Sequence, residues 1–359
     1  MKNILIFGYF GVGNLGDEAN LRQLIKLLRE TDAKNQITVI SADPSRTASA
    51  YDVAAVGKFD LFGIIKALFK ADLLLGNGGS HFQDITSKRS LLYYSALVLA
   101  AKLLKVRVFL YGQGIGPLRS GLGKFITGRV LTMADLITVR DRLSIVALAE
   151  LNVRKPEIHF TAEPLLASNG VEALLVKKYW GEQEQGKQLK LGLIIKDFKF
   201  IKKGFWDRLL DCLSWDSNVE TYLIPVQNTK DSEFLQEFSA NYGLTILNTD
   251  EGWEQLQQIA GGLDLLVSAR LHGLVAGVLQ GVPCYGLAAD PKVEGFCLQL
   301  GIPFSILTFE TEWMGISNKI TNFLVHPQEC LGYQSKLPFW KARALENQII
   351  LKQYLENND

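Results

Sequence analysis

The sequence predicts an α/β protein made of two Rossmann-like lobes, each with a doubly wound parallel sheet. Short, apolar, β-prone runs alternate with amphipathic segments at helical spacing along most of the chain. This alternation stops in a polar stretch around residues 181–188 and then starts again. The length of 359 residues also exceeds what one ordinary core needs and suits two domains.

The first lobe is expected to contain a six-stranded sheet with crossover helices between its strands. A parallel strand needs a long connection back across the sheet, and the amphipathic segments supply it. Strands are predicted at residues 3–7, 37–41, 72–75, 107–111, 136–139 and 158–161, and helices at residues 17–30, 59–69, 90–104, 122–134 and 142–151.

The second lobe repeats this pattern. Strands are predicted at residues 191–195, 220–225, 245–247, 263–267, 282–286 and 302–307, and helices at residues 205–213, 232–242, 253–260, 273–279, 311–324 and 339–356. The expected domains are residues 1–165, a linker at 166–190, a second lobe at 191–335, and a helix in 336–359 that packs back toward the first lobe. This layout is similar to the GT-B architecture of glycosyltransferases, in which two such lobes face a cleft.

Composition excludes several classes of protein. The formal net charge is +1, so no global field attracts nucleic acid or an anionic membrane. The four cysteines show neither CxxC spacing nor paired histidines, so no metal, cofactor or disulfide framework is predicted. The apolar run at residues 3–7 is too short for a signal peptide, and a cytoplasmic protein is expected. The sequence carries no prediction of the oligomeric state.

The strongest candidate site lies at residues 264–292. A buried strand ends in Ser268, and Arg270, Leu271, His272 and Gly273 follow at the start of an apolar helix. Ligands of such sheets bind at the carboxyl ends of the strands, where a helix N-terminus favours an anion. Lys292 is expected to end the next strand and adds a second cation at the same edge. The alternative is that Arg270 caps carbonyl groups and His272 is structural.

Glycine-rich loops follow the strands of the first lobe. The first contains Gly11, Gly13 and Gly16 in a G-x-G-x-x-G pattern, but Asp17 in the following helical turn would repel a pyrophosphate. A polyhydroxy ligand that contacts Asn14 or Asp17 fits better.

Two further loops extend this edge of the first lobe. The second loop carries polar side chains that are expected to bind a sugar: Asn77, Ser80, His81, Gln83 and Asp84. The alternative is that these side chains hydrogen-bond to one another and cap the next helix. Gln113 lies in the third loop. Arg140 ends the next strand and is expected to point into the cleft, because the adjacent Asp141 is badly placed to pair with it.

The order of these motifs resembles the polysaccharide pyruvyl transferase family of the CsaB type. The matching segments span nearly the whole chain: GYFGVGNLGDEA, GNGGSHFQDITSKRSLLYY, YGQGIGPL, ADLITVRD, TAEP, SARLHGLVAGVLQGVP and DPKVEGF. Two departures stand out, since Asn77 replaces an expected glycine and Glu163 replaces an expected aspartate. Asn77 could change which acceptor sugar fits.

The resemblance implies transfer of the enolpyruvyl unit of phosphoenolpyruvate (PEP), a co-substrate, to a sugar of a cell-wall or exported polysaccharide precursor. The products would be a pyruvate ketal and phosphate. Arg140, His272 and Lys292 match active positions of the family, and residues 270–272 match its PEP signature. The chemistry needs a general acid, which we assign to His272. It also needs cations that hold the phosphate and carboxylate of PEP, which we assign to Arg270 and Lys292, with Arg140 adding a third cation from the first lobe.

Two other functions remain open. One is a GT-B glycosyltransferase that uses a nucleotide sugar, and the other is a non-catalytic carbohydrate-binding protein. A lipid-linked glycan acceptor would place the protein at the inner face of the plasma membrane with peripheral contact only. Residues 59–69 are apolar enough for such a contact, but a buried crossover helix is the preferred interpretation.

Overall fold

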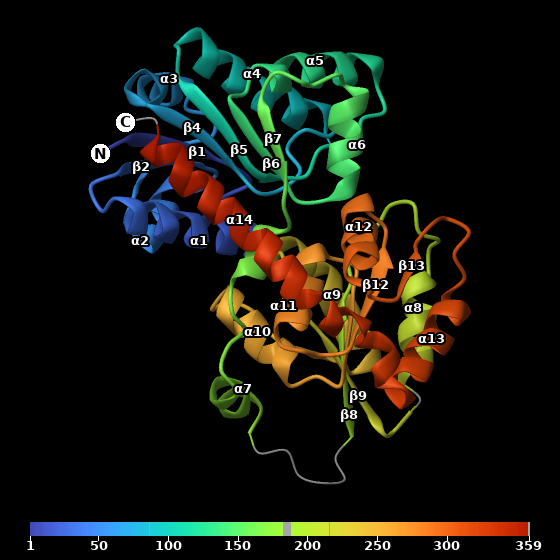
Figure 1. Cartoon of the computed structure of the whole chain (residues 1–359). Coiled ribbons are helices and arrows are strands. Elements are labelled where there is room, and N and C mark those ends of the chain that lie inside the picture. The colour runs from blue at the N-terminus through green and yellow to red at the C-terminus, as the bar shows by residue number, and fades with distance from the viewer. Residues whose placement is uncertain (86, 182–187, 215, 358–359) are drawn as a thin grey trace. The chain divides into compact units, whose positions relative to one another are not determined.

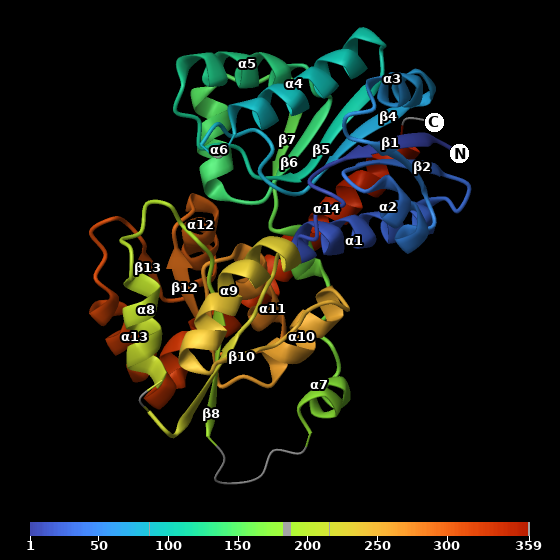
Figure 2. The ribbon, with the colours of Figure 1, turned by 180° about the vertical axis from the view of Figure 1, so that it is seen from behind.

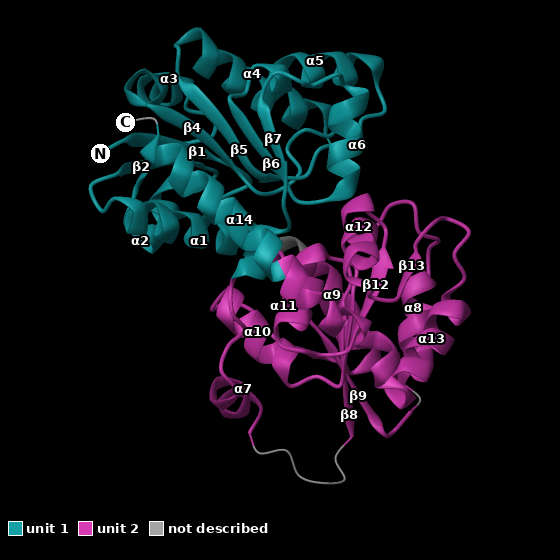
Figure 3. Cartoon of the chain, viewed as in Figure 1, with its two compact units in different colours: residues 1–167, 341–359 teal, residues 168–340 magenta. Residues whose placement is uncertain are grey.

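A computed structural model describes residues 1–85, 87–181, 188–214 and 216–357. The chain divides into two compact units (Figure 3): unit 1 is Met1–Ala167 with Lys341–Asp359, and unit 2 is Ser168–Trp340. Each unit contains one parallel sheet, so the α/β class with two doubly wound sheets is confirmed. Figures 1 and 2 show the elements of each unit from two sides.

Unit 1 is built on a seven-stranded parallel sheet of order β3-β2-β1-β4-β5-β6-β7. Its strands are β1 (Asn3–Phe7), β2 (Gln36–Ser41), β3 (Ala54–Gly57), β4 (Leu73–Asn77), β5 (Arg107–Gln113), β6 (Leu136–Val139) and β7 (Glu157–Phe160). Its helices are α1 (Leu15–Thr31), α2 (Pro44–Tyr51), α3 (Leu61–Lys70), α4 (Lys88–Leu103), α5 (Gly121–Thr132) and α6 (Arg142–Glu150), followed by a 3-10 turn, η1 (Pro164–Ala167).

The prediction missed β3 and α2. Strand β3 is short, lies at the sheet edge and is only partly buried, so it lacks the apolar run of an inner strand. Helix α2 does carry a start signal, because Asp43 caps it and Pro44 occupies its first turn.

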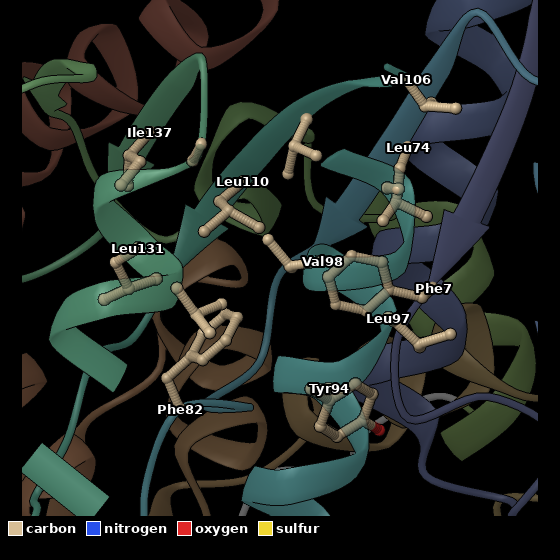
Figure 4. Packing of buried hydrophobic residues seen from close by; sticks show 14 of the residues in the cluster. Phe7, Leu74, Phe82, Tyr94, Leu97, Val98, Val106, Leu110, Leu131 and Ile137 are labelled. Atoms are coloured by element: carbon tan, nitrogen blue, oxygen red, sulfur yellow. The ribbon is translucent and has the colours of Figure 1, made fainter. Parts of the chain in front are cut away.

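The two faces of this sheet have separate cores. On one face, Phe7, Leu74 and Leu110 pack with side chains of α3, α4 and α5, including Val98 and Leu131 (Figure 4). The opposite face uses the alternate residues of β1, because successive strand residues point to opposite sides, and these contact α1 and α14 (Leu337–Glu356).

Unit 2 repeats this design with a six-stranded parallel sheet of order β10-β9-β8-β11-β12-β13. Its strands are β8 (Leu189–Ile194), β9 (Val219–Leu223), β10 (Thr245–Ile246), β11 (Leu265–Ser268), β12 (Cys284–Ala288) and β13 (Phe304–Ile306). Its helices are α7 (Ala173–Trp180), α8 (Phe205–Ser214), α9 (Asn228–Tyr242), α10 (Trp253–Gly261), α11 (Leu271–Leu279), α12 (Pro291–Leu300) and α13 (Trp313–Val325), and 3-10 turns follow at η2 (Pro327–Cys330) and η3 (Gly332–Ser335).

The segment expected to be a linker contains η1 and α7, and its residues 182–187 lie outside the described part of the chain. The C-terminal part of α14 belongs to unit 1. There the Asn347 side chain accepts a hydrogen bond from the Thr161 hydroxyl (2.9 Å) and donates to the Ala162 carbonyl (3.1 Å). These buried bonds fix α14 against the end of β7.

Among the described helices, none is long and apolar enough to cross a membrane. The four cysteines are free thiols, and Cys284, Cys297 and Cys330 are buried. The sheets therefore depend on apolar packing rather than on disulfides.

Candidate functional site

In both units the first strand pairs with the fourth, so the strand order reverses between them. In unit 2 these strands are β8 and β11, and Ile194 pairs with Ser268 at their carboxyl ends. The crevice at such a reversal is the usual ligand site of an open α/β sheet. The side chains that follow β8, β11 and β12 therefore form the candidate site of unit 2.

Arg270 follows β11 and precedes α11. Its backbone N–H donates to the Ser268 hydroxyl (3.1 Å), which fixes the turn, and no described side chain caps the helix. The Arg270 guanidinium pairs with the buried carboxylate of Asp231, and Asp231 also accepts the backbone N–H of Gln227 (2.8 Å). The Nε of Arg270 is buried and lacks a hydrogen-bond partner in the described structure, which leaves one donor for a ligand.

His272 is the second residue of α11. The sequence predicted that this helix begins near Gly273, but it begins at Leu271, so His272 lies in the first turn. Gly273 is required there, because a Cβ atom would lie 2.4 Å from the Ser268 Oγ and 2.5 Å from the Ile194 Cδ1. The helix thus approaches the strand ends closely and directs its positive dipole end toward the site.

Lys292 was expected at the end of a strand, but it lies in the first turn of α12. Asp290 caps this helix by accepting the Lys292 N–H (3.1 Å), and its other oxygen lies 3.3 Å from the Lys292 Nζ. Burial raises the pKa of Asp290, but Lys292 and Lys196 lower it more, so its net pKa falls below the ordinary value. Asp290 therefore stays ionised and offsets part of the positive charge.

The sequence analysis missed Lys196. This residue follows β8, directly beside the carboxyl end of β11, where the Ala269 N–H donates to the Ile194 carbonyl (2.7 Å). Burial, together with the charges of Arg270 and Lys292, lowers the pKa of Lys196 to about 8. The signal was its place after the first strand of the second lobe, which a doubly wound sheet puts beside the fourth.

Three cations thus meet at this edge of unit 2: Lys196, Arg270 and Lys292. The charges that face Lys196 also include the carboxylates of Asp231 and Asp290. Burial and the charges of Arg270 and Lys292 disfavour the charged form of Lys196, and an anion that bound here would counter the repulsion and stabilise that charged form. The arrangement is suited to a small ligand with more than one negative charge.

Arg140 of unit 1 differs from its prediction. It is buried, with 4% of its surface exposed, and its Nη1 donates to Glu163 at 2.8 Å while its Nη2 donates to the Ser80 hydroxyl at 3.0 Å. Glu163 also accepts from the Asn20 amide at 3.1 Å. Arg140 is therefore not free to leave its loop. Asp141 was expected to be badly placed to pair with Arg140, but its carboxylate lies 3.8 Å from the Arg140 Nε. The shorter ion pair is with Glu163, which follows the next strand of the sheet.

His81 is held in one tautomer. The Gln113 side-chain N–H group donates to the Gly78 carbonyl (2.7 Å). The side-chain oxygen of Gln113 therefore faces the His81 Nδ1 at 3.0 Å and accepts a hydrogen bond from it. Burial, together with the nearby charge of Arg140, lowers the pKa of His81 to about 4, so the ring is neutral with a lone pair on Nε2. Gln113 is fully buried, so it orients His81 and does not contact a sugar directly.

Most other residues predicted to bind the acceptor have structural partners. Asn14 caps α1 by accepting the Gly16 N–H (3.2 Å), and Gln83 accepts the Ile85 N–H (2.9 Å). Asp84 accepts the backbone N–H groups of Arg119 and Ser120 and the Ser120 hydroxyl (2.7, 2.8 and 2.6 Å). Asp17 is buried in the first turn of α1. Asp84 therefore orders the segment before α5, and Asn14 orders the start of α1.

Three buried polar side chains at this edge have atoms without a partner among the described residues. Neither the side-chain oxygen nor the side-chain nitrogen of Asn77, at the end of β4, has a hydrogen-bond partner. The side-chain oxygen of Asn20 and the Nε2 of His81 also lack one. A Cβ on Gly78 would lie 3.5 Å from the Asn20 amide, and one on Gly79 3.0 Å from the His81 Nε2. Unsatisfied donors and acceptors together suit a ligand with several hydroxyl groups.

Two sheets of this strand order, each with polar side chains at its carboxyl edge, define an α/β protein of the GT-B type. The family described as polysaccharide pyruvyl transferase matches residues 14–291. The chain belongs to this family, which confirms the resemblance seen in its motifs at the level of the family. Comparison with curated proteins gave no match.

Solved structures similar to the chain share its fold at low sequence identity. The Anabaena protein Alr3699/HepE in complex with UDP-glucose is 12% identical with a TM-score of 0.64, and 99% of each chain is covered. UDP-GlcNAc 2-epimerase from Neisseria meningitidis, bound to UDP-GlcNAc, is 11% identical with a TM-score of 0.65, over 99% of this chain and 100% of that one. MnaA of S. aureus with UDP is 13% identical with a TM-score of 0.66, over 100% and 98%.

Proposed function

We propose that the chain transfers the enolpyruvyl unit of PEP to sugar hydroxyls of a cell-wall or exported polysaccharide precursor. The products are a cyclic pyruvate ketal and phosphate. Family membership supports pyruvyl transfer. The observation that carries the choice of PEP is the cluster of Lys196, Arg270 and Lys292 at the reversal point of unit 2.

PEP carries a phosphate and a carboxylate on the same carbon, and the cluster offers a donor for each. Arg270 contributes its unpartnered Nε and a planar guanidinium, and Lys196 and Lys292 contribute compact point charges. The first backbone N–H groups of α11 add the donors of a helix N-terminus. Asp231 and Asp290 hold Arg270 and Lys292 in position before the ligand arrives.

The reaction needs a proton at the methylene carbon of PEP and a nucleophile at the neighbouring carbon. We assign the proton to His272, whose place in the first turn of α11 lies beside the cation cluster. One sugar hydroxyl adds to the carbon that bears the phosphate. The proton that this hydroxyl loses returns to His272 and replaces the proton that His272 delivered to the methylene carbon. Phosphate then leaves with the C–O bond electrons, a second hydroxyl takes its place, and phosphate receives that hydroxyl's proton. The cations stabilise the departing charge.

Unit 1 is assigned the acceptor sugar. Asn77 and the Nε2 of His81 provide buried, unpartnered groups for hydroxyls, and Ser80 lies beside them. Arg140 holds Ser80 and Glu163, so its proposed task is to organise this loop rather than to contact PEP. His81 is neutral over the physiological range and orients a hydroxyl as an acceptor.

A nucleotide-sugar-dependent glycosyltransferase is the second candidate. The similar structures contain UDP, UDP-glucose or UDP-GlcNAc, and this observation favours it. An acidic anchor for the ribose would be needed late in unit 2. Asp290 occupies that position, but it caps α12 and pairs with Lys292.

Thermal-shift measurements with PEP, phosphate, pyruvate, UDP and UDP-GlcNAc separate the two candidates. A ligand that binds only the folded chain raises its melting temperature, so PEP should stabilise it more than phosphate or pyruvate alone. His272→Ala should retain this binding but lose phosphate release from PEP in the presence of a glycan acceptor. His326→Ala, which changes an exposed histidine at the end of α13, is the matched control. Stabilisation by UDP-GlcNAc with no response to PEP would favour the glycosyltransferase.

A further inference from the structure

The outer side of α3, α4 and α5 is apolar and exposed. The residues before and within α3 include Phe59, Phe62 and Phe69, which are 81%, 80% and 71% exposed. The buried crossover helix preferred from the sequence is therefore only half right, because Ile64 and Leu68 alone are buried in α3. The apolar members of this outer face are Phe59, Leu61, Phe62, Ile65, Phe69, Leu92, Leu99, Leu103, Leu122 and Phe125.

These side chains lie on one side of unit 1. The inner residues of α3, α4 and α5 share one core with a single face of the sheet, so the opposite sides of the three helices all point away from it. Both views show the three helices side by side across that face (Figures 1 and 2). The exposed residues thus form one broad surface rather than scattered positions.

The charge of this surface is mainly positive, with the exposed Asp60, which caps α3, lying between Phe59 and Leu61. Helix α3 carries two basic residues, α4 three and α5 two, and none of the three helices contains an aspartate or glutamate. The chain as a whole is balanced, with 38 basic and 37 acidic residues. The basic residues of the three helices are Lys66, Lys70, Lys88, Arg89, Lys102, Lys124 and Arg129. All of them are exposed except Lys102, which is partly buried and pairs with Asp135. We call these residues and the ten apolar ones the basic apolar face.

We propose that the basic apolar face docks the chain peripherally on an anionic lipid bilayer. Aromatic and leucine side chains enter the boundary between headgroups and acyl chains, while lysine and arginine reach the phosphates beside them. A bilayer accepts apolar and cationic groups mixed over a broad surface. A second copy of the chain is a poorer partner, because a two-fold contact through this face would bring the same cations together.

The inference is independent of the proposed chemistry. Neither the cluster of unit 2 nor the polar loops of unit 1 belong to the basic apolar face. A transferase, a glycosyltransferase and a binding protein would dock in the same way, so failure of either proposal leaves the other to be tested separately.

Co-sedimentation of the full chain with lipid vesicles tests the proposal. One set of vesicles contains phosphatidylcholine alone, and the other contains phosphatidylglycerol as about a third of its lipid. We expect binding to the anionic vesicles, weaker binding at high salt and little binding to phosphatidylcholine. Equal binding to both, or none to either, would overturn the proposal.

Two pairs of substitutions separate the contributions of charge and apolar contact. Each cation at an anionic surface contributes about fivefold to binding, so Lys66→Glu with Lys70→Glu should reduce it by at least about 25-fold. Phe62→Ser with Phe69→Ser should lower binding at every salt concentration, because buried apolar contact is lost.

Matched controls change similar side chains elsewhere. Arg154→Glu with Lys155→Glu reverses two exposed charges before β7, and Phe309→Ser with Val325→Ser removes exposed apolar groups of unit 2. These controls should bind vesicles like the wild type, and all variants should keep its melting temperature and PEP response. If the controls lose binding as strongly, or if Phe62→Ser halves a dimer's mass in light scattering without lipid, the proposed lipid surface is wrong.

Discussion

Replacing Lys196 with arginine or methionine separates the charge of this side chain from its titration. Lys196 follows β8 and adds a positive charge beside Arg270 and Lys292. Burial and these two cations lower its pKa to about 8, so it loses its proton within an accessible pH range. Arginine keeps its charge at every pH used for proteins, and methionine has a similar length without charge.

The expected magnitude follows from this pKa. A group with a pKa of about 8 is about nine-tenths protonated at pH 7 and about one-tenth protonated at pH 9. If PEP binds the protonated form, its dissociation constant should rise about tenfold between pH 7 and pH 9. Losing one charged hydrogen bond in Lys196→Met should weaken binding about 10- to 100-fold at pH 7.

Isothermal titration calorimetry with PEP at several pH values measures these effects. Wild type should lose affinity as the pH rises, whereas Lys196→Arg and Lys196→Met should each show an almost constant affinity between pH 7 and pH 9. A tenfold loss of affinity that persists in Lys196→Arg would show that another group titrates, and the assignment of Lys196 would be refuted.

Stability without PEP provides a control with a defined sign. The pKa of Lys196 in the folded chain is below its ordinary value of 10.5, so the unfolded chain holds more protons between about pH 8 and pH 10.5. Relative to Lys196→Met, wild type should therefore gain free energy of unfolding as the pH rises through this window. The opposite sign would mean that Lys196 is held by a carboxylate rather than repelled by cations.

Three further predictions concern the folded framework. Because burial lowers the pKa of His81 to about 4, wild type should lose about 2 kcal/mol of unfolding free energy relative to His81→Leu between pH 7 and pH 5, measured by urea denaturation; equal pH dependence would contradict this. Glu163→Ala removes the nearest carboxylate from the buried Arg140, leaving the Asp141 carboxylate at 3.8 Å, and should cost about 3–5 kcal/mol in the same assay. Arg140→Met should restore part of this loss in the double variant, whereas additive losses would show that Arg140 and Glu163 do not interact. Gly273→Ala should cost about 1–3 kcal/mol of unfolding free energy and weaken PEP binding, because the added Cβ overlaps two side chains. Gly315→Ala, where nothing lies within 4 Å of an added Cβ, should be neutral or stabilising. Similar effects at both sites would argue against the close approach of α11.

The fold was largely predictable because buried parallel strands leave long apolar runs. Both sheets and all of the predicted strands were found within a few residues of their expected places. The edge strand β3 was missed because it is only partly buried and its sequence lacks such a run. The exposure of α3 was also missed. An apolar helix can have the same sequence whether the side that faces away from the sheet is buried in a core or covered by another partner.

The candidate site was predictable where function depends on local sequence. Arg270, His272 and Lys292 follow strand ends that the pattern identified, and the structure puts Arg270 and Lys292 in one charged cluster. The environment of Arg140 was not predictable, because its partner Glu163 follows a different strand. Lys196 was missed for the same reason, since only the strand order places it beside β11.

The most direct test of the account is the product formed from PEP and a glycan acceptor. We would incubate the chain with PEP and a panel of free and lipid-linked bacterial glycans, follow phosphate by ³¹P NMR and determine the acceptor's mass by mass spectrometry. The account predicts that phosphate appears only with an acceptor, that this acceptor gains a pyruvate ketal, and that His272→Ala abolishes both. Acceptor modification from a nucleotide sugar, with PEP left unconsumed, would contradict it.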